Sequence, residues 1–252
     1  MSGPQVASPL DGATVLVTGA SRGIGAATAR AVSRDGATVV LHYSSNETAA
    51  RSVAGSLAGP VHLVQGDMLA PDAAEIIWAE ALARVGRIDV LVNNAGAWMS
   101  SRLDDASEWH SGWDRNMILN LRAAADLCRL AILHYRGRGG GTIINVASRS
   151  AHRGDDRDHL AYGAAKAGLL ALTKGIARGY GPDGVLAYAV APGWVATDLT
   201  ADELSDTDTS QWPLGEPAPP EDVAETIAFL ASGRARHATG ATIDITGADY
   251  VR

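Results

Sequence analysis

Short runs of apolar, often β-branched residues alternate along the chain with longer stretches rich in alanine, in which apolar positions recur every three or four residues. Most of the short runs are continuous rather than alternating, which is typical of strands buried on both faces of a parallel sheet. They predict strands at residues 14–18, 38–43, 61–65, 90–93, 142–146, 185–190 and 241–245. The longer stretches predict helices near residues 24–35, 46–58, 72–85, 107–136, 161–180 and 220–232.

We therefore expect an α/β protein with one domain over residues 1–252: a single-domain Rossmann fold, with a doubly wound seven-stranded parallel sheet and helices on both faces. No linker, repeat or low-complexity tract marks a second domain. Residues 198–220 are acidic and rich in proline, and they form a long connection for a compact domain. We interpret them as either a lid over a substrate site or a partly disordered loop.

Composition narrows the function classes. The chain is 46% hydrophobic and 19% charged, which is ordinary for a soluble globular protein. Its net charge of −7 argues against nucleic acid or an anionic membrane surface as the main partner. The single cysteine, Cys128, excludes an internal disulfide and fits a reducing compartment. We see neither a secretory signal nor an apolar run of membrane-spanning length, and we expect a cytoplasmic protein without a metal site.

A glycine-rich turn follows the first predicted strand and opens the first predicted helix. It reads Thr18-Gly19-Ala20-Ser21-Arg22-Gly23-Ile24-Gly25. Glycines here let the backbone approach a pyrophosphate at the amino end of a helix. Such a turn is a weak signal by itself, but between a strand and a helix it predicts a dinucleotide site rather than a purely structural turn. We expect the cofactor to contact Gly19, Ser21, Arg22, Gly23, Ile24 and Gly25.

The residues after the second predicted strand bear on the choice between NAD and NADP. NAD-binding chains usually place an acidic residue about 20 residues past the glycines, where it holds the ribose 2′-hydroxyl. This chain has no acidic residue there before Glu47. Arg22 can reach a 2′-phosphate, and Ser44 and Ser45 can donate hydrogen bonds to it. We expect NADP in preference to NAD, with Tyr43 beside the adenine; the alternative is a solvated Arg22 that selects no phosphate.

Tyr162 and Lys166 stand four residues apart, one turn of a predicted helix, and Lys166 is one of two lysines among 21 basic residues. The pKa of a phenol, about 10, is high for proton exchange at neutral pH, and a nearby ammonium group stabilises the phenolate and lowers that pKa. Lysine offers a compact point charge for this purpose, whereas arginine offers a planar fork. The pair predicts a tyrosine that exchanges protons with a substrate.

Together, these motifs resemble those of the short-chain dehydrogenase/reductase family over nearly the whole chain. The glycine-rich turn is followed by Asn93-Asn94-Ala95-Gly96, a helical Asn120, Ser148, Tyr162 with Lys166, and Pro192-Gly193. Within the family the chain looks most like 3-oxoacyl-[acyl-carrier-protein] reductases, through Pro213-Leu214-Gly215 and Pro220-Glu221-Asp222-Val223. The resemblance implies an NADP-dependent oxidoreductase that transfers hydride between the nicotinamide and a carbonyl or secondary alcohol substrate. It also implies a homo-oligomer, either a tetramer or a dimer.

The resemblance further implies roles for four residues. Tyr162 would be the general acid in carbonyl reduction, or the base in alcohol oxidation. Lys166 would lower the pKa of Tyr162 and hold the nicotinamide ribose. Ser148 would orient the substrate carbonyl, and Asn120 would fix a water that relays protons to Lys166.

Two of these assignments have neighbours of the same residue type. Ser150 is an alternative to Ser148, and Asn116 is an alternative to Asn120, although the Trp-Asp start and Asn-Leu end of the motif favour Asn120. Further cofactor contacts implied by the resemblance are Asp67, Met68, Asn94, Ala95, Gly96, Tyr162, Lys166, Pro192, Gly193, Val195 and Thr197. Asp67 is alternatively a plain residue at a strand end.

The substrate pocket should be bounded by Trp98, residues 149–159, Trp194 and a lid at 198–212. The tryptophans suit a flat or bulky apolar carbonyl compound, unless they are core residues. The charged residues at 149–159 either bias the substrate or are solvated. An acyl thioester on an acidic carrier protein would need a basic patch, for which the arginines between residues 122 and 138 are candidates unless they form a solvated or interface face.

Two other classes of function stay open on this fold. A catalytically silent NADP-binding sensor would be expected to lose the tyrosine or the lysine of the pair. A non-redox enzyme on the same scaffold, such as a lyase, often loses the glycine-rich turn. This chain retains both features, which favours a reductase.

Overall fold

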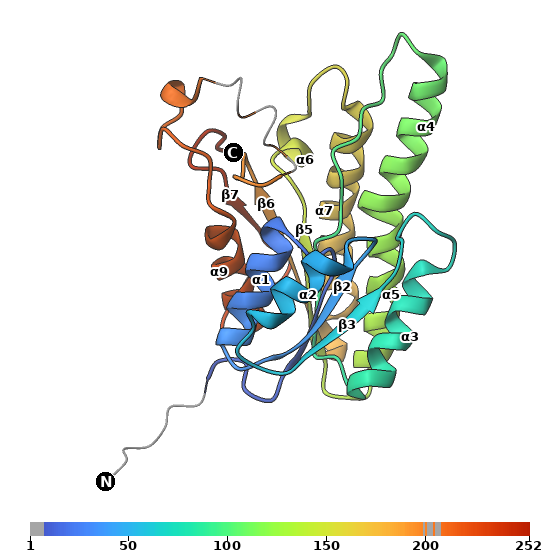
Figure 1. The fold of residues 1–252 in the computed structure, drawn as a ribbon, viewed down its shortest axis with the longest axis vertical. Helices are drawn as coiled ribbons and strands as arrows, with labels where there is room; N and C mark the ends of the chain where they lie inside the picture. Colours follow the sequence, from blue (N-terminus) through green and yellow to red (C-terminus); the bar gives the residue numbers. More distant parts are fainter. Residues whose placement is uncertain (1–7, 199, 201–203, 205–207) are drawn as a thin grey trace.

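The computed structural model describes residues 8–198, 200, 204 and 208–252 (Figure 1). The described part contains one parallel sheet with the strand order β3-β2-β1-β4-β5-β6-β7. The strands are β1 (Thr14–Val17), β2 (Thr38–Tyr43), β3 (Val61–Gln65), β4 (Val90–Asn93), β5 (Gly141–Val146), β6 (Val185–Pro192) and β7 (Thr242–Ile245). The predicted doubly wound Rossmann sheet is confirmed, and its strand ends differ from the predicted ones by at most two residues.

The strands form where the chain is apolar on both sides of the backbone. Every residue of β1, β4 and β6 is buried. Because successive side chains of a strand point to opposite faces, each strand contributes to two cores. Val15 and Leu41 belong to one core, whereas Leu16 and Val40 belong to the other.

Helices cover both faces of the sheet, as the sequence predicts (Figure 1). One face carries α1 (Gly23–Arg34), α2 (Glu47–Gly55) and α9 (Pro220–Ala231). The other side carries α3 (Ala73–Val85), α4 (Ala106–Met117), α5 (Ala123–Tyr135) and α7 (Leu160–Tyr180). Shorter elements are α6 (Ser150–Arg153) and 3-10 turns at Gly181–Asp183, Thr209–Gln211 and Arg236–Ala238.

The helix predicted over residues 107–136 is not one continuous α-helix. A π-helical turn, η1 (Ile118–Arg122), separates α4 from α5. Such turns insert one extra residue and often occur at functional sites. This one carries Asn120, which is buried. The sequence pattern could not reveal it, because the apolar period continues on both sides of the insertion.

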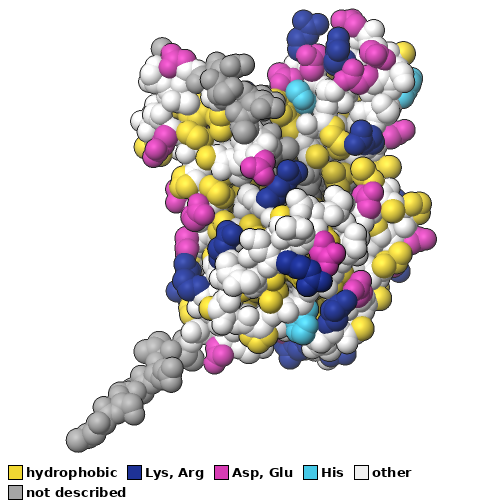
Figure 2. All heavy atoms as spheres, in the orientation of Figure 1, with side chains coloured by type: hydrophobic (Ala, Val, Ile, Leu, Met, Phe, Trp, Pro, Cys, Tyr) yellow, Lys and Arg dark blue, Asp and Glu magenta, His cyan; other side chains and the backbone are white. Residues whose placement is uncertain are grey.

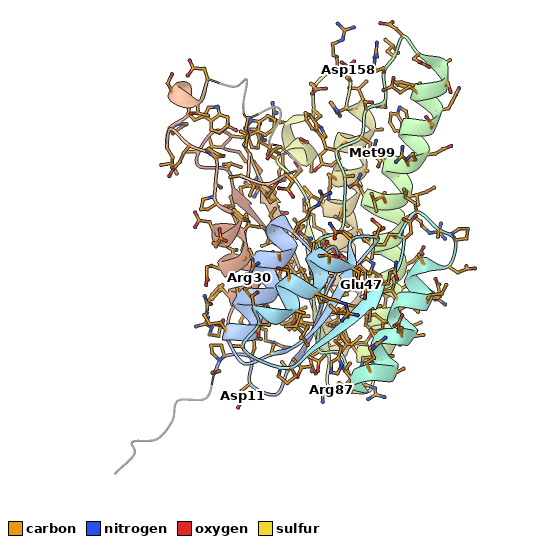
Figure 3. All side chains as sticks on the ribbon, viewed as in Figure 1. Asp11, Arg30, Glu47, Arg87, Met99 and Asp158 are labelled. Atoms are coloured by element: carbon orange, nitrogen blue, oxygen red, sulfur yellow. The ribbon has the colours of Figure 1, made fainter. Side chains whose placement is uncertain are left out.

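The carboxyl ends of the strands lie at one end of the molecule. The chain winds from β1 towards β3 on one side and from β4 towards β7 on the other, so the switch between β1 and β4 leaves a crevice beyond the strand ends. In Figure 3, Asp11 and Arg87, which precede β1 and β4, lie at the lower end. Met99 and Asp158, which follow β4 and β5, lie at the upper end.

The predicted lid at 198–220 falls partly outside the described residues, because 199, 201–203 and 205–207 belong to it. Among the residues that are described, a bridge between Val195 and Ala218 brings the two ends of this connection together. In the same described part of the chain, no helix is long and apolar enough to cross a membrane. Nor do three or more His, Cys, Asp or Glu side chains gather in these residues to hold a metal ion.

Candidate active site

A cavity of about 810 Å³ opens at the carboxyl ends of the strands, within the range of ligand sites. The predicted site residues that line it are Gly19, Ser21, Arg22, Gly23, Ile24, Ser44, Ser45, Asp67, Met68, Asn94, Ala95, Gly96, Ser148, Tyr162, Lys166, Pro192, Gly193, Val195 and Thr197. Three others, Gly25, Tyr43 and Asn120, are buried and do not line it. Charged side chains of both signs gather at this upper end of the molecule (Figure 2).

At two of its glycines, the glycine-rich turn approaches neighbouring backbone too closely for a side chain. The φ angle is 62° at Gly19 and 52° at Gly23, in the left-handed region that favours glycine. A Cβ at Gly19 would lie 2.9 Å from Ala95 Cα, and a Cβ at Gly25 would lie 2.3 Å from the Gly19 carbonyl oxygen. The turn therefore brings the amino end of α1 to the cavity, where free N–H groups and the helix dipole favour an anion such as pyrophosphate.

Asn94 and Thr18 hold this turn in place from the end of β4. Asn94 Nδ2 donates to the Thr18 carbonyl oxygen at 2.8 Å and to that of Gly19 at 3.1 Å. The Thr18 hydroxyl accepts from the backbone N–H groups of Asn94 and Ala95, both at 2.9 Å. The polar atoms of Asn94 thus brace the backbone of the turn, and the residue also lines the cavity.

Tyr162 and Lys166 lie near the start of α7, with Lys166 Nζ 5.7 Å from the centre of the Tyr162 ring. Lys166 Nζ donates to the Val146 carbonyl oxygen at 2.9 Å, and burial lowers the pKa of this lysine to about 8. Burial also raises the pKa of Tyr162 to about 12; the Ser148 hydroxyl opposes this shift, and the Asp155 carboxylate adds to it. The expected lowering of the Tyr162 pKa is therefore wrong for the polypeptide alone, because desolvation of the phenolate dominates.

Ser148, rather than Ser150, is the serine that acts on the Tyr162 phenol. Its hydroxyl opposes the rise in the Tyr162 pKa that burial causes. The same hydroxyl accepts from the backbone N–H of Ser150 at 3.1 Å. Ser150 itself is buried at the start of α6. The end of β5 and the start of α7 thus bring Ser148 and Tyr162 together at the cavity wall.

Asn120 is held by the loop after β4. Its Oδ1 accepts from the Ala97 N–H at 3.1 Å, and its Nδ2 donates to the Ala97 carbonyl at 2.9 Å and to Asn116 Oδ1 at 3.0 Å. A Cβ at Gly96 would lie 2.7 Å from Asn120 Oδ1 and 3.3 Å from Lys166 Nζ. The glycine at position 96 therefore lets Asn120 and Lys166 approach the same stretch of backbone.

The residues after β2 leave no carboxylate facing the cavity. Ser44 and Ser45 are exposed at its edge. Glu47, the first acid after the strand, accepts a hydrogen bond from Arg51 Nε at 2.9 Å, one turn further along α2. Arg22 is exposed at the cavity, with Nη1 3.9 Å from a carboxylate oxygen of Asp198.

Tyr43, which we predicted beside the adenine, is buried and does not line the cavity, whereas the neighbouring His42 does. Neighbouring side chains of a strand face opposite sides, so only one of the two can face the site. Tyr43 packs into the core beneath α1 and α2. His42 accepts from the Gly19 N–H through Nδ1 at 3.1 Å. The sequence shows only that His42 and Tyr43 point to opposite faces of the sheet. It does not show which face borders the cavity, because β2 is buried on both faces.

Aromatic and charged side chains that we predicted to bound the substrate pocket also line the cavity. Trp98 stacks on His159 with ring centres 3.8 Å apart, and its indole Nε1 donates to Asp155 Oδ2 at 3.3 Å. Trp194 meets Trp98 edge to face at 6.1 Å. The guanidinium carbon of Arg149, a residue that sequence reasoning did not single out, lies 5.0 Å from the centre of the Trp194 ring.

Residues 19–247, most of the chain, match a family model described as enoyl-(acyl carrier protein) reductase. The chain is also 40% identical to L-rhamnose 1-dehydrogenase (NAD(P)(+)) of Azotobacter vinelandii, with 94% of this chain and 96% of the relative covered. The protein belongs to the short-chain dehydrogenase/reductase family.

Other members of the short-chain dehydrogenase/reductase family agree with this assignment. The chain is 33% identical to 3-oxoacyl-[acyl-carrier-protein] reductase of Staphylococcus aureus, covering 94% of this chain and 98% of the relative. The solved structure of an angucycline C-6 ketoreductase with bound NADP has a TM-score of 0.86 at 33% identity, covering 95% of this chain and 96% of that one. These relatives are oxidoreductases of alcohol and carbonyl groups.

The cavity of this short-chain dehydrogenase/reductase fits the nicotinamide cofactor that the family uses. The glycine-rich turn brings the amino end of α1 to one part of it, whereas Tyr162 and Lys166 line another part. Side chains at Gly19 or Gly96 would collide with their surroundings, so the backbone stays open to a ligand at both points.

Proposed function

We propose that this short-chain dehydrogenase/reductase is an NADP-dependent ketoreductase in which Tyr162 exchanges a proton with the substrate. The observation that carries the proposal is the Tyr162 phenol, which lines the cavity together with Ser148 and has the buried ammonium group of Lys166 beside its ring. No other tyrosine lines this cavity among the described residues.

The reduction needs a hydride at the carbonyl carbon and a proton at the carbonyl oxygen. NADPH, when bound, supplies the hydride with its two electrons and is left as NADP⁺. Ser148 donates a hydrogen bond that orients the carbonyl oxygen, and Tyr162 gives its proton to that oxygen, which completes the alcohol. A pKa of about 12 keeps the phenol protonated at neutral pH, ready to donate. Alcohol oxidation would run through the same groups in reverse, with the phenolate as base.

Lys166 and Asn120 would support the tyrosine after proton transfer. The Lys166 ammonium stabilises the phenolate that Tyr162 becomes. A lysine pKa of about 8 lies near neutral pH, which suits a group that passes protons inward from water. We assign Asn120 the role of fixing the water next to Lys166, because both side chains closely approach Gly96.

We propose NADP rather than NAD on the arrangement around the end of β2. Ser44 and Ser45 can donate hydrogen bonds to a 2′-phosphate, and the Arg22 guanidinium is exposed beside the same cavity. Glu47, the only acid close after the strand, is turned towards Arg51. An angucycline ketoreductase with bound NADP supports this choice, whereas the rhamnose dehydrogenase is named for either cofactor.

For the substrate, we propose a bulky carbonyl compound, because Trp98 and Trp194 offer broad apolar surfaces at the outer cavity. An acyl thioester is a second choice, supported by the similarity to a 3-oxoacyl-[acyl-carrier-protein] reductase. We also propose residues 198–220 as the substrate lid, because the ring of Trp212 lies parallel to that of Trp194 at 6.4 Å.

We further propose that the protein is a cytoplasmic homo-oligomer, either tetramer or dimer. Ile118 and Leu133, in η1 and α5, are apolar side chains that are 39% and 54% exposed. Covering such side chains is a common reason for self-association. Burial raises the pKa of the Cys128 thiol to about 12, which is consistent with an unreactive cysteine in a reducing compartment. Sedimentation velocity measures the assembly directly.

Tyr162→Phe tests the proposal, with NADPH oxidation measured against keto sugars, β-ketoacyl thioesters, ketosteroids and quinones. We expect turnover of one class to be lost in Tyr162→Phe while the Kd for NADPH changes little. Tyr180→Phe, at the exposed end of the same helix, is the matched control and should keep full activity. Substantial residual activity in Tyr162→Phe would overturn the assigned role. Tight NADPH binding without turnover across the panel would favour a sensor, and turnover without a change in NADPH would favour a non-redox enzyme.

A further inference from the structure

The end of β2 connects two loops that border the cofactor cavity, through one residue, His42. Its backbone carbonyl accepts from the Ala20 N–H at 2.8 Å, and its ring Nδ1 accepts from the Gly19 N–H at 3.1 Å. On the other side, its ring Nε2 lies 3.0 Å from the Gly66 carbonyl oxygen, just after β3. The side chain thus ties the glycine-rich turn to the loop that follows the third strand.

These contacts require the neutral ring. A backbone N–H can only donate, so Nδ1 must present its lone pair to Gly19. A carbonyl oxygen can only accept, so the single ring proton must sit on Nε2 and point at Gly66. His42 is 1% exposed, and burial, opposed by the Gly66 carbonyl, lowers its pKa below the ordinary 6.5.

The loop on the far side of the ring has little room to adjust. A Cβ at Gly66 would lie 2.6 Å from the Ile77 side chain of α3, so the backbone there is pressed against that helix. Protonation of the ring leaves the donation from Nε2 to the Gly66 carbonyl intact and removes only the acceptor of the Gly19 N–H, so the contact to the turn is the one that is lost. The turn is the part that would hold the pyrophosphate.

We propose that His42 is a positioning residue that locks the glycine-rich turn for the cofactor only while its imidazole ring is neutral. This inference rests on the proposed function, because the cofactor is the ligand whose affinity it sets. A protonated ring would turn an N–H towards the Gly19 N–H, so two donors would face each other and the turn would lose this anchor, although Asn94 would still brace it. No predicted role required a histidine at this position.

Charged groups on the surrounding elements do not hold the ring protonated. Arg22 lies on the turn, Asp67 follows Gly66, and Glu75 lies on α3. All three are exposed, so solvent screens their fields. Burial is the dominant influence on His42, and it favours the neutral form.

The affinity for the cofactor should therefore fall as the pH falls, and the size of this fall has an upper limit. Binding selects the neutral ring, so the Kd rises as the pH falls through the folded-state pKa of His42, which lies below 6.5. One linked proton allows at most about a tenfold increase in Kd for each pH unit. Phosphate groups of the cofactor also titrate near pH 6, so a variant must separate the two effects.

His42→Asn separates them, because asparagine Oδ1 can occupy the place of Nδ1 and accept from Gly19 without titrating. We would measure NADP⁺ binding by calorimetry from pH 8 to pH 5 in the wild type, His42→Asn and His42→Phe. The control is His62→Asn on the adjacent strand β3, outside this cavity. At pH 7.5, His42→Asn should bind within about threefold of the wild type, and His42→Phe about tenfold more weakly, because it leaves the Gly19 N–H without an acceptor.

As the pH falls, the wild type and His62→Asn should lose more affinity for NADP⁺ than His42→Asn. In His42→Asn, only the titration of the cofactor phosphate remains to change the affinity. Identical pH curves for wild type and His42→Asn would overturn the inference. A wild type that binds no NADP⁺ at any pH would instead remove the proposed function. In that case amide exchange of Gly19, compared between wild type and His42→Asn at the same pH, still decides whether the ring holds the turn. Acid-induced loss of protection in the wild type alone is expected, and equal protection would refute it.

Discussion

Replacing Lys166 with methionine should stabilise the protein at neutral pH while it abolishes turnover. Lys166 is only 4% exposed, and burial lowers its pKa from 10.5 to about 8. The difference, 10.5 minus 8, is about 2.5, and at about 1.4 kcal/mol per pKa unit the buried charge costs about 3 kcal/mol of folding free energy. Loss of the hydrogen bond to Val146 offsets about 1–2 kcal/mol of this, so Lys166→Met should gain about 1–2 kcal/mol at pH 7.

The stability gain of Lys166→Met should disappear in alkali. Between pH 8 and 10.5 the unfolded wild type binds more protons at this lysine than the folded one, so wild-type stability rises with pH across that window. Below pH 8, Lys166 is protonated in both the folded and the unfolded wild type, and the buried charge lowers the stability of the folded protein by its full amount. Methionine carries no charge at any pH. The gap between variant and wild type should therefore shrink by up to about 3 kcal/mol as the pH is raised from 7 to 10.5.

Urea unfolding at half-unit pH steps from 7 to 10 measures this gap. The chain supplies its own control, because Lys174, the only other lysine, is exposed on the same helix. Lys174→Met should follow the wild type within about 0.5 kcal/mol at every pH, as exposed substitutions usually do. A pH-independent gap for Lys166→Met, or a variant less stable than wild type at pH 7, would show that the folded protein does not pay for a buried ammonium at this site.

Three other predictions concern the cofactor, the helix and the pH profile. Asp198→Asn should tighten NADP⁺ binding roughly threefold, because the Asp198 carboxylate, 3.9 Å away, competes for the Arg22 guanidinium. Arg22→Ala should weaken NADP⁺ binding. Calorimetry should show no change in NAD⁺ binding for either variant. Gly175→Ala should raise the unfolding free energy in urea by about 0.5–1 kcal/mol, because a Cβ inside α7 meets no atom within 4 Å. The reduction rate should fall above pH 8 as Lys166 loses its charge, while Tyr162, with a pKa of about 12, stays protonated; a flat rate to pH 10 would contradict this assignment.

The sequence was sufficient for the sheet and for the inner part of the site. Continuous apolar runs predict strands buried on both faces when they are short, rich in β-branched residues and bounded by turn residues, as they are here. The turn at Thr18–Gly25 was predictable for a similar reason. A Cβ at Gly25 would lie 2.3 Å from the Gly19 carbonyl oxygen, so no residue with a side chain fits at that position. Such close packing restricts the position to glycine, so it can be predicted from the sequence.

The features that sequence reasoning missed depend on tertiary structure. The π turn at Ile118–Arg122 adds one residue inside an unbroken apolar period. His42 and Tyr43 are neighbours in a strand buried on both sides, so their residue types do not say which one faces the cavity. The high pKa of Tyr162 arises from burial, whereas the spacing to Lys166 reports only the nearby charge. Each of these features depends on how several helices and strands pack around the residue, which the local sequence does not show.

Burial shifts the pKa values of Tyr162 and Lys166 in opposite directions, and both shifts disfavour charge. A buried phenolate alone would be costly, and so would a buried ammonium alone. When Tyr162 gives up its proton, however, each charge gains an opposite charge beside it in a region of low dielectric, so the two ionisations support one another. Before the transfer, the pair therefore consists of a neutral Tyr162 phenol and a Lys166 ammonium that loses its proton readily. After the transfer, it consists of the Tyr162 phenolate and the Lys166 ammonium as an ion pair. In the proposed mechanism, the buried Lys166 would therefore stabilise the product of proton donation. Burial of the same ammonium group lowers the stability of the resting protein.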